Sequence, residues 1–147
     1  MNPSEFFLPM IPPKVTNQMH RIVADPRGHR PRFYDPPELA EARAKFLSHL
    51  SVHAPAEKLS GPVRLLVIWC FPAEGKHRHG EFKTSKPDTD NLQKLFRDCM
   101  TRTGFWKDDA QVAVEHVEKR YSDTPGIFVR VSPLDKNRNE EGEALPK

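Results

Sequence analysis

Apolar residues recur at helical spacing in a segment near the middle of the chain. The stripe consists of Leu39, Ala42, Phe46 and Leu50. This spacing predicts an amphipathic helix from Asp35 to about Leu50. Asp35 is a favourable N-cap, Pro36 suits the first helical position, and Glu38 fits a capping box.

A second helical pattern covers residues 88–103 and stops at Gly104, a residue typical of helix C-termini. Its apolar face contains Leu92, Leu95, Phe96 and Cys99. The opposite side is formed by Asp90, Asn91, Lys94, Arg97 and Asp98. We therefore expect a helix that packs one face on the core and exposes a charged face to solvent.

Four apolar segments predict strands, at residues 5–11, 63–71, 111–121 and 127–131. The segment 63–71 is almost continuously apolar, which is typical of a strand covered on both faces. The last two segments are separated by five turn-forming residues, so they predict a hairpin.

The remaining segments predict loops and a tail. Residues from Pro12 to Phe33 show no periodicity and predict a long loop, and residues 135–147 predict a disordered tail. The order strand, helix, strand, helix, two strands predicts an α/β or α+β fold: a small mixed sheet with two main helices. Residues 1–134 are expected to form this single domain.

Composition narrows the class of protein. A chain of 147 residues is long enough for one domain with its own core. No apolar run approaches the ~20 residues of a membrane span, and residues 1–5 lack the features of a signal peptide. Cys70 and Cys99 exclude a disulfide framework. These features predict a cytoplasmic protein.

The net charge is only +3, but basic residues cluster in two loops. The first cluster contains Lys14, His20, Arg21, Arg27, His29, Arg30 and Arg32. The second contains Lys76, His77, Arg78, His79, Lys83 and Lys86. Basic loops attract phosphate through counterion release. The alternative is a pair of solvated loops without a ligand.

Two pairs of aspartates flank the second helix. Asp88 and Asp90 lie at its start, and Asp108 and Asp109 follow its end. We expect the helix and its return to bring these pairs together, where the carboxylates would raise one another's pKa. A divalent cation removes that conflict, and all-oxygen ligands favour Mg²⁺ or Mn²⁺. Such an ion leaves positions for a scissile phosphate and an attacking water, which favours metal-assisted phosphodiester hydrolysis.

Lys94 lies one turn beyond Asp90, where its charge would stabilise a reacting phosphate. Each part of this site has a simpler alternative. Asp88 or Asp90 would serve as a helix cap, Asp90 and Lys94 as a surface ion pair, and residues 108–109 as turn residues. Asp98 is expected to pair with a neighbouring cation, Arg97, Arg102 or Lys94, rather than to bind metal.

Other phosphate and metal motifs are excluded. An EF-hand loop starting at Asp88 would have Gln93 in place of glycine and Cys99 in place of glutamate. The sequence contains neither the Gly-x-x-x-x-Gly-Lys-Ser/Thr loop nor the Gly-x-Gly-x-x-Gly motif of nucleotide-binding proteins. His77 and His79 lack further Cys or His residues at zinc-ligand spacing. Trp106 is expected to be a core or hinge aromatic rather than a base-stacking residue.

Three segments together resemble the RusA family of Holliday junction resolvases: DTDNLQK at 88–94, FRD at 96–98 and GFWKDDAQV at 104–112. Weaker similarity extends to Leu8-Pro9, Pro12-Pro13 and Asn17, which resemble the first strand and turn of the family. Small resolvases of this kind are common in phage and prophage genomes, so the resemblance implies a bacterial or phage-encoded protein.

The resemblance implies a homodimer that binds four-way DNA junctions and makes paired, Mg²⁺-dependent nicks during DNA recombination and repair. By the same resemblance, the catalytic residues are Asp88, Asp90, Asp109 and Lys94, and Asp108 coordinates or supports the metal. DNA-binding residues would be Lys76, Arg78, Lys83, Lys86 and, on the following strand, Lys119. Two alternatives remain: a nuclease for other branched or flap DNA, and a non-catalytic DNA-binding module.

Overall fold

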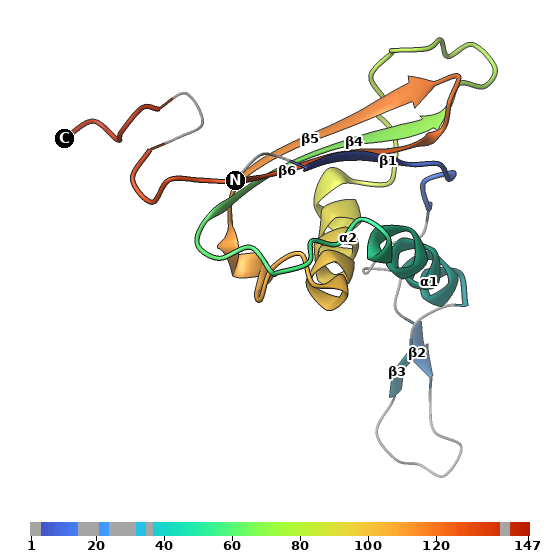
Figure 1. Cartoon of the computed structure of the whole chain (residues 1–147). Helices are drawn as coiled ribbons and strands as arrows, with labels where there is room; N and C mark the ends of the chain where they lie inside the picture. Colours follow the sequence, from blue (N-terminus) through green and yellow to red (C-terminus); the bar gives the residue numbers. More distant parts are fainter. Residues whose placement is uncertain (1–3, 15–20, 24–31, 35–36, 139–141) are drawn as a thin grey trace.

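The computed structural model describes residues 4–14, 21–23, 32–34, 37–138 and 142–147. In this part of the chain, a four-stranded sheet carries two helices on one face, in an α+β fold as predicted (Figure 1). Its elements are β1 (Ser4–Leu8), β2 (Arg21–Val23), β3 (Arg32–Tyr34), α1 (Pro37–Ser51), β4 (Val63–Pro72), α2 (Thr89–Thr103), the 3₁₀ helix η1 (Asp109–Gln111), β5 (Val112–Ser122) and β6 (Gly126–Pro133). Within the described ranges, no helix combines the length and apolar character needed to cross a membrane.

Strand β4 occupies the centre of the sheet, whose order is β1-β6-β4-β5. It pairs in parallel with β5 and antiparallel with β6. The predicted hairpin is therefore wrong, although both of its strands exist, because β4 lies between them. The crossover through α2 returns the chain to the end where β4 began, so β5 enters the sheet parallel to β4.

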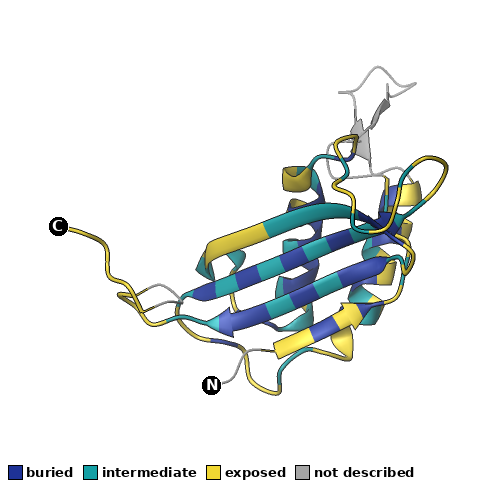
Figure 2. Ribbon diagram, turned by 90° about the horizontal axis from the view of Figure 1, so that it is seen from above, coloured by how far each residue is buried: buried dark blue, intermediate teal, exposed yellow. Residues whose placement is uncertain are grey.

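The two faces of the sheet differ in burial. Along β4, Val63, Leu65, Val67, Trp69 and Phe71 are buried, and the alternate residues are only partly buried (Figure 2). The described helices cover one face alone (Figure 1). The prediction that this strand is covered on both faces is thus wrong. The apolar residues of β4 on the face without helices are partly buried because the strand lies between two partner strands.

The N-terminal elements differ from the predictions in detail. Strand β1 ends at Leu8 rather than at residue 11. The predicted loop contains a short antiparallel ribbon, in which β2 pairs with β3. All four stripe residues of α1 are buried as predicted, whereas the proposed capping residues Asp35 and Pro36 lie outside the described residues. The described part of the tail, residues 135–138 and 142–147, contains no helix or strand, and its disorder stays a prediction.

Helix α2 matches its predicted bounds and apolar face. The four predicted stripe residues are buried, and Gly104 ends the helix in a left-handed conformation with φ 94°. Its N–H donates to the carbonyls of Met100 and Thr101, which satisfies acceptors that the helix itself leaves unpaired at its C-terminal end. Trp106 is buried as predicted and donates from Nε1 to the Thr101 hydroxyl at 2.7 Å.

Gln93 is a buried amide within the apolar side of α2, with 1% of its surface exposed. Its Oε1 accepts from Trp69 Nε1 at 2.6 Å, and its Nε2 donates to Glu115 Oε2 at 3.1 Å. The amide therefore ties α2 to the sheet at two strands, β4 and β5.

We expect Gln93→Leu to lower the free energy of unfolding by about 1–3 kcal/mol, because it leaves the buried Trp69 N–H without an acceptor. Urea unfolding followed by tryptophan fluorescence measures this loss. Lys94→Gln, on the exposed side of the same helix, serves as the control and should change stability by less than about 0.5 kcal/mol. Equal stabilities of the two variants would show that the amide bridge does not stabilise the fold.

Candidate functional site

Asp88 and Asp90 lie at the N-terminus of α2, as predicted. Asp88 occupies the N-cap position, but its side chain makes no capping hydrogen bond. It pairs instead with Lys86, whose Nζ lies 2.9 Å from the carboxylate. Asp90 is exposed in the first turn. The helix dipole favours negative charge at this end of α2. Because neither carboxylate caps the helix through a hydrogen bond with the described residues, both remain available to a ligand.

Lys94 is exposed one turn beyond Asp90. The structure records no hydrogen bond or ion pair between Lys94 and any other described residue, so the alternative of an Asp90–Lys94 surface pair is not observed. Asp98 pairs with Arg102 at 3.2 Å, one of the partners expected for it. Lys94 is therefore an ammonium group that the described part of the fold leaves unused.

Asp108 and Asp109 lie at the other end of α2, where η1 begins. The Asp108 carboxylate accepts from the Ala110 N–H at 2.9 Å and forms a capping box with Gln111. The turn-residue alternative therefore describes Asp108 correctly. Asp109 is partly buried, and its carboxylate makes no hydrogen bond or ion pair with the described residues.

The two carboxylate pairs lie far apart within one chain. Helix α2 has 15 residues and is about 22 Å long. Strand β5 then runs back along the helix. Its residue Lys119 contacts the Pro87 carbonyl, next to Asp88, and lies about 23 Å along the strand from Val112, which follows η1. No group of three or more His, Cys, Asp or Glu side chains among the described residues is arranged to hold a metal ion.

The prediction that the helix and its return bring all four carboxylates together is therefore wrong for a single chain. After Gly104 the chain passes through residues 105–108 into η1 at the C-terminal end of α2, and it does not return toward Asp88 before β5 begins. The individual roles of Asp88, Asp90 and Asp109 stay predictions.

The second basic loop, residues 73–88, is fixed along the outer edge of β5. Gly80 N–H donates to the Tyr121 carbonyl and Tyr121 N–H to the Glu81 carbonyl, both at 2.8 Å. Lys83 N–H donates to the Lys119 carbonyl at 2.9 Å. The loop thus satisfies the backbone groups of an otherwise open strand edge, and it holds the segment that leads into Asp88.

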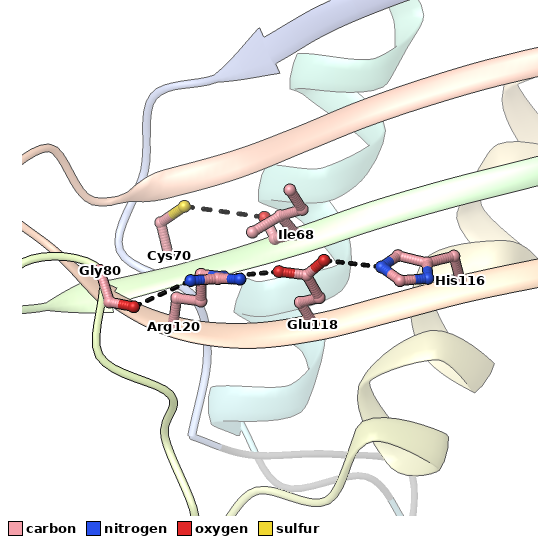
Figure 3. Close-up of polar contacts among 6 residues, drawn as sticks. All are labelled: Ile68, Cys70, Gly80, His116, Glu118 and Arg120. Atoms are coloured by element: carbon pink, nitrogen blue, oxygen red, sulfur yellow. Dashed lines mark hydrogen bonds and ion pairs between the residues drawn. The ribbon is translucent and has the colours of Figure 1, made fainter.

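Arg120 fastens this loop by its side chain (Figure 3). Its NH1 donates to the Gly80 carbonyl at 2.9 Å, and its guanidinium lies 4.0 Å above the Phe82 ring. Its Nε pairs with Glu118, which also contacts His116 Nε2 at 2.6 Å. Hydrogen bonds from His116 and then Arg120 lower the pKa of the Glu118 carboxyl. Glu118 therefore stays ionised and keeps Arg120 in place.

The five basic residues predicted to bind DNA divide into two groups. Lys76, Arg78 and Lys86 are exposed. Lys83 lies about 5 Å from the Phe71 and Tyr121 ring centres. Lys119 donates to the carbonyls of Ser85 and Pro87 at 2.7 and 2.8 Å, and burial followed by the nearby Lys83 charge lowers the pKa of its ammonium. Three of the five thus face solvent, and two hold the loop.

Replacing Lys119 by methionine should loosen the segment that precedes Asp88, because two carbonyls lose a charged donor. We expect a loss of about 1–3 kcal/mol in unfolding free energy and faster amide exchange at residues 83–90. Denaturant unfolding and hydrogen exchange measure the two effects. Lys76→Met removes an exposed charge of the same loop and should change neither. Unchanged exchange in the Lys119 variant would contradict the positioning role.

Three polar residues that organise the site were not identified from the sequence: Gln93, Gln111 and Glu115. Gln93 interrupts an apolar stripe, which is a signal for a buried amide. The spacing Asp-x-x-Gln at 108–111 fits a capping box and is a signal for Gln111. Glu115, which also pairs with Arg97 at 3.6 Å, has no local signal because its partners lie on α2.

Comparison with known proteins places these features in a family. Residues 11–132 match the family described as Endodeoxyribonuclease RusA, a range that includes α2 and both carboxylate pairs. A protein of Lactococcus phage r1t named "Crossover junction endodeoxyribonuclease rusA" is 31% identical over 73 residues. The aligned region covers 50% of this chain and 56% of that relative, so the chain spans little more than half of the curated protein it matches.

Proposed function

This chain belongs to the RusA family, and we propose that it is a divalent-metal-dependent endonuclease that resolves four-way DNA junctions. It would hydrolyse one phosphodiester bond in each of two opposing strands during DNA recombination and repair. The observation that carries the proposal is the pairing of carboxylates at both ends of α2, with Lys94 unpartnered among the described residues of the same helix. Contacts within the described segments give Asp90, Asp109 and Lys94 no structural role that requires their charge.

The carboxylates suit a hard divalent cation. Mg²⁺ is commonly held by one or two protein carboxylates together with substrate phosphate oxygens, and Asp88 and Asp90 supply such a pair at one helix end. Asp109, with Asp108 beside it, supplies further carboxylate oxygens at the other end. We propose Mg²⁺, with Mn²⁺ as a substitute. When bound, the ion supplies charge stabilisation and a lowered pKa for water.

The protein's own residues supply position and positive charge. Lys119 fixes the carbonyls next to Asp88, so the carboxylate starts from a defined backbone. The unpaired ammonium of Lys94 would stabilise negative charge that develops on the phosphate or on the leaving oxygen. The exposed Lys76, Arg78 and Lys86 would bind neighbouring phosphates without reading sequence.

The separation of the carboxylate pairs favours a homodimer. A two-fold axis perpendicular to α2 near its middle exchanges the two helix ends. In such a dimer, Asp88 and Asp90 of one copy would lie beside Asp109 of the second copy, at two equivalent positions. A four-way junction offers equivalent strands related by the same symmetry, so a two-fold dimer presents two sites to two scissile phosphates.

Cleavage of a synthetic four-way junction, labelled in turn on each strand, tests this proposal. With Mg²⁺ or Mn²⁺ we expect symmetric nicks in two opposing strands, and with EDTA none. A flap and a linear duplex of the same arms serve as controls. Equal cleavage of the flap would support a nuclease for other branched DNA. Binding without any product across Mg²⁺ and Mn²⁺ titrations would support a non-catalytic DNA-binding module and refute the proposal.

A further inference from the structure

We propose that a groove between Lys58 and Lys107 binds a phosphodiester of the DNA strand, separately from the loop that leads into α2. This inference rests on the proposed function and extends it. The groove has a volume of about 450 Å³. It is lined by Lys58, Leu59, Ser60, Gly61, Lys107 and Gln111.

Gln111 joins the two walls of the groove. Its Nε2 donates to the carbonyls of Leu59 at 2.9 Å and Gly61 at 3.0 Å. Its Oε1 accepts from the N–H groups of Lys107 and Asp108 at 3.0 and 3.1 Å. All four hydrogen-bonding positions of this amide are thereby used on backbone. One side chain thus fixes the two lysine-bearing segments relative to each other.

A backbone contact strengthens the same connection. Leu59 N–H donates to the Phe105 carbonyl at 2.9 Å, and Leu59 forms a bridge with Trp106. Leu59 is 8% exposed and Trp106 is fully buried, so this contact belongs to the core. The two lysines therefore extend from a rigid base, which reduces the entropy lost when a ligand orders them.

The charge of the groove suits an anion. Its lining, as far as the structure describes the chain, contains two ammonium groups, one hydroxyl and no carboxylate. The side-chain ammonium of neither lysine makes a hydrogen bond or ion pair with the described residues. Lys58 passes close to Gly104, its Cε lying 4.0 Å from where a Cβ would stand. Both charges are therefore free to meet phosphate oxygens beside the C-terminal end of α2.

The position of the groove points to a nucleic-acid phosphodiester rather than a free anion. Lys107 directly precedes Asp108 and Asp109, and Gln111 caps the turn that holds them. A DNA strand that reaches Asp109 must pass beside Lys107. The groove would then hold a phosphate next to the scissile one and orient the strand toward the carboxylates.

The salt dependence of junction binding tests this site, with EDTA present to prevent cleavage. For Lys58→Gln and Lys107→Gln we expect the slope of log K against log salt to fall by roughly 0.9 each, and additively in the double variant. Lys45→Gln is the matched control, because it removes the same charge on α1 outside the groove, where Lys45 pairs with Glu41. Its slope should equal that of the wild type.

Three outcomes would overturn the inference. Wild-type slopes in both groove variants would show that no phosphate is bound there, and equal losses in Lys45→Gln would show only long-range electrostatics. If inorganic phosphate displaced the junction more effectively than chloride at equal ionic strength, the groove would be a site for a free anion. A wild type that binds junctions but never nicks them refutes the proposed function alone, because the slopes still test the groove.

Discussion

Replacing Asp90 by asparagine is expected to abolish junction nicking while junction binding stays intact or strengthens. Asparagine preserves the size of an exposed side chain, so the fold should not change. It removes a proposed metal ligand from the N-terminus of α2. Because even residues that only orient metal ligands contribute about 10–100-fold to activity, we expect the nicking rate to fall by well beyond about 100-fold. Loss of the negative charge also reduces repulsion of the DNA phosphates. Single-turnover nicking and a binding titration in EDTA measure the two effects.

Asp98→Asn is the matched control for this experiment. Asp98 is the second carboxylate on α2; it is partly exposed, lies two turns beyond Asp90 and pairs with Arg102. Its variant should nick at the wild-type rate. Wild-type nicking by the Asp90 variant would remove Asp90 from the catalytic site. Equal loss of nicking in both variants would indicate a general effect of charge on α2 and not a specific role.

Helix α2 could be predicted from the sequence because all of its determinants are local. The apolar stripe gives the buried face, Gly104 gives the end, and the aspartates mark the start, so the helix bounds and the exposure of Asp90 and Lys94 follow from fewer than twenty residues. These are also the residues on which the proposed chemistry depends. Local patterning was sufficient here because the tertiary structure buries the same face that the stripe defines.

The strand pairing and the placement of Asp109 could not be predicted in the same way. Strands β5 and β6 both have the expected composition, yet which strand separates them depends on the crossover through α2. The separation of Asp88 from Asp109 likewise depends on where the chain turns after Gly104. The sequence spacing shows that the two aspartate pairs flank one helix. The same spacing fits both a chain that folds back to join the pairs in space and a chain that leaves them at opposite ends of the helix.

That separation leads to the second large expected effect, which concerns mixtures of two inactive proteins. Asp90→Asn and Asp109→Asn should each be inactive alone, and nicking should return when the two are mixed and allowed to exchange subunits. If each site combines Asp90 of one copy with Asp109 of the other, a mixed dimer holds one site with both residues intact. Random exchange then restores about a quarter of the wild-type sites.

The strand specificity of the recovered activity makes this test decisive. A mixed dimer with one intact site should nick one strand of a junction and leave the opposing strand whole. Mixing Asp88→Asn with Asp90→Asn is the control, because both changes lie at the same helix end and no dimer regains a complete site. If each site lay within one chain, neither mixture would recover. Recovery in the first mixture alone would therefore show that the two ends of α2 act together only across two copies.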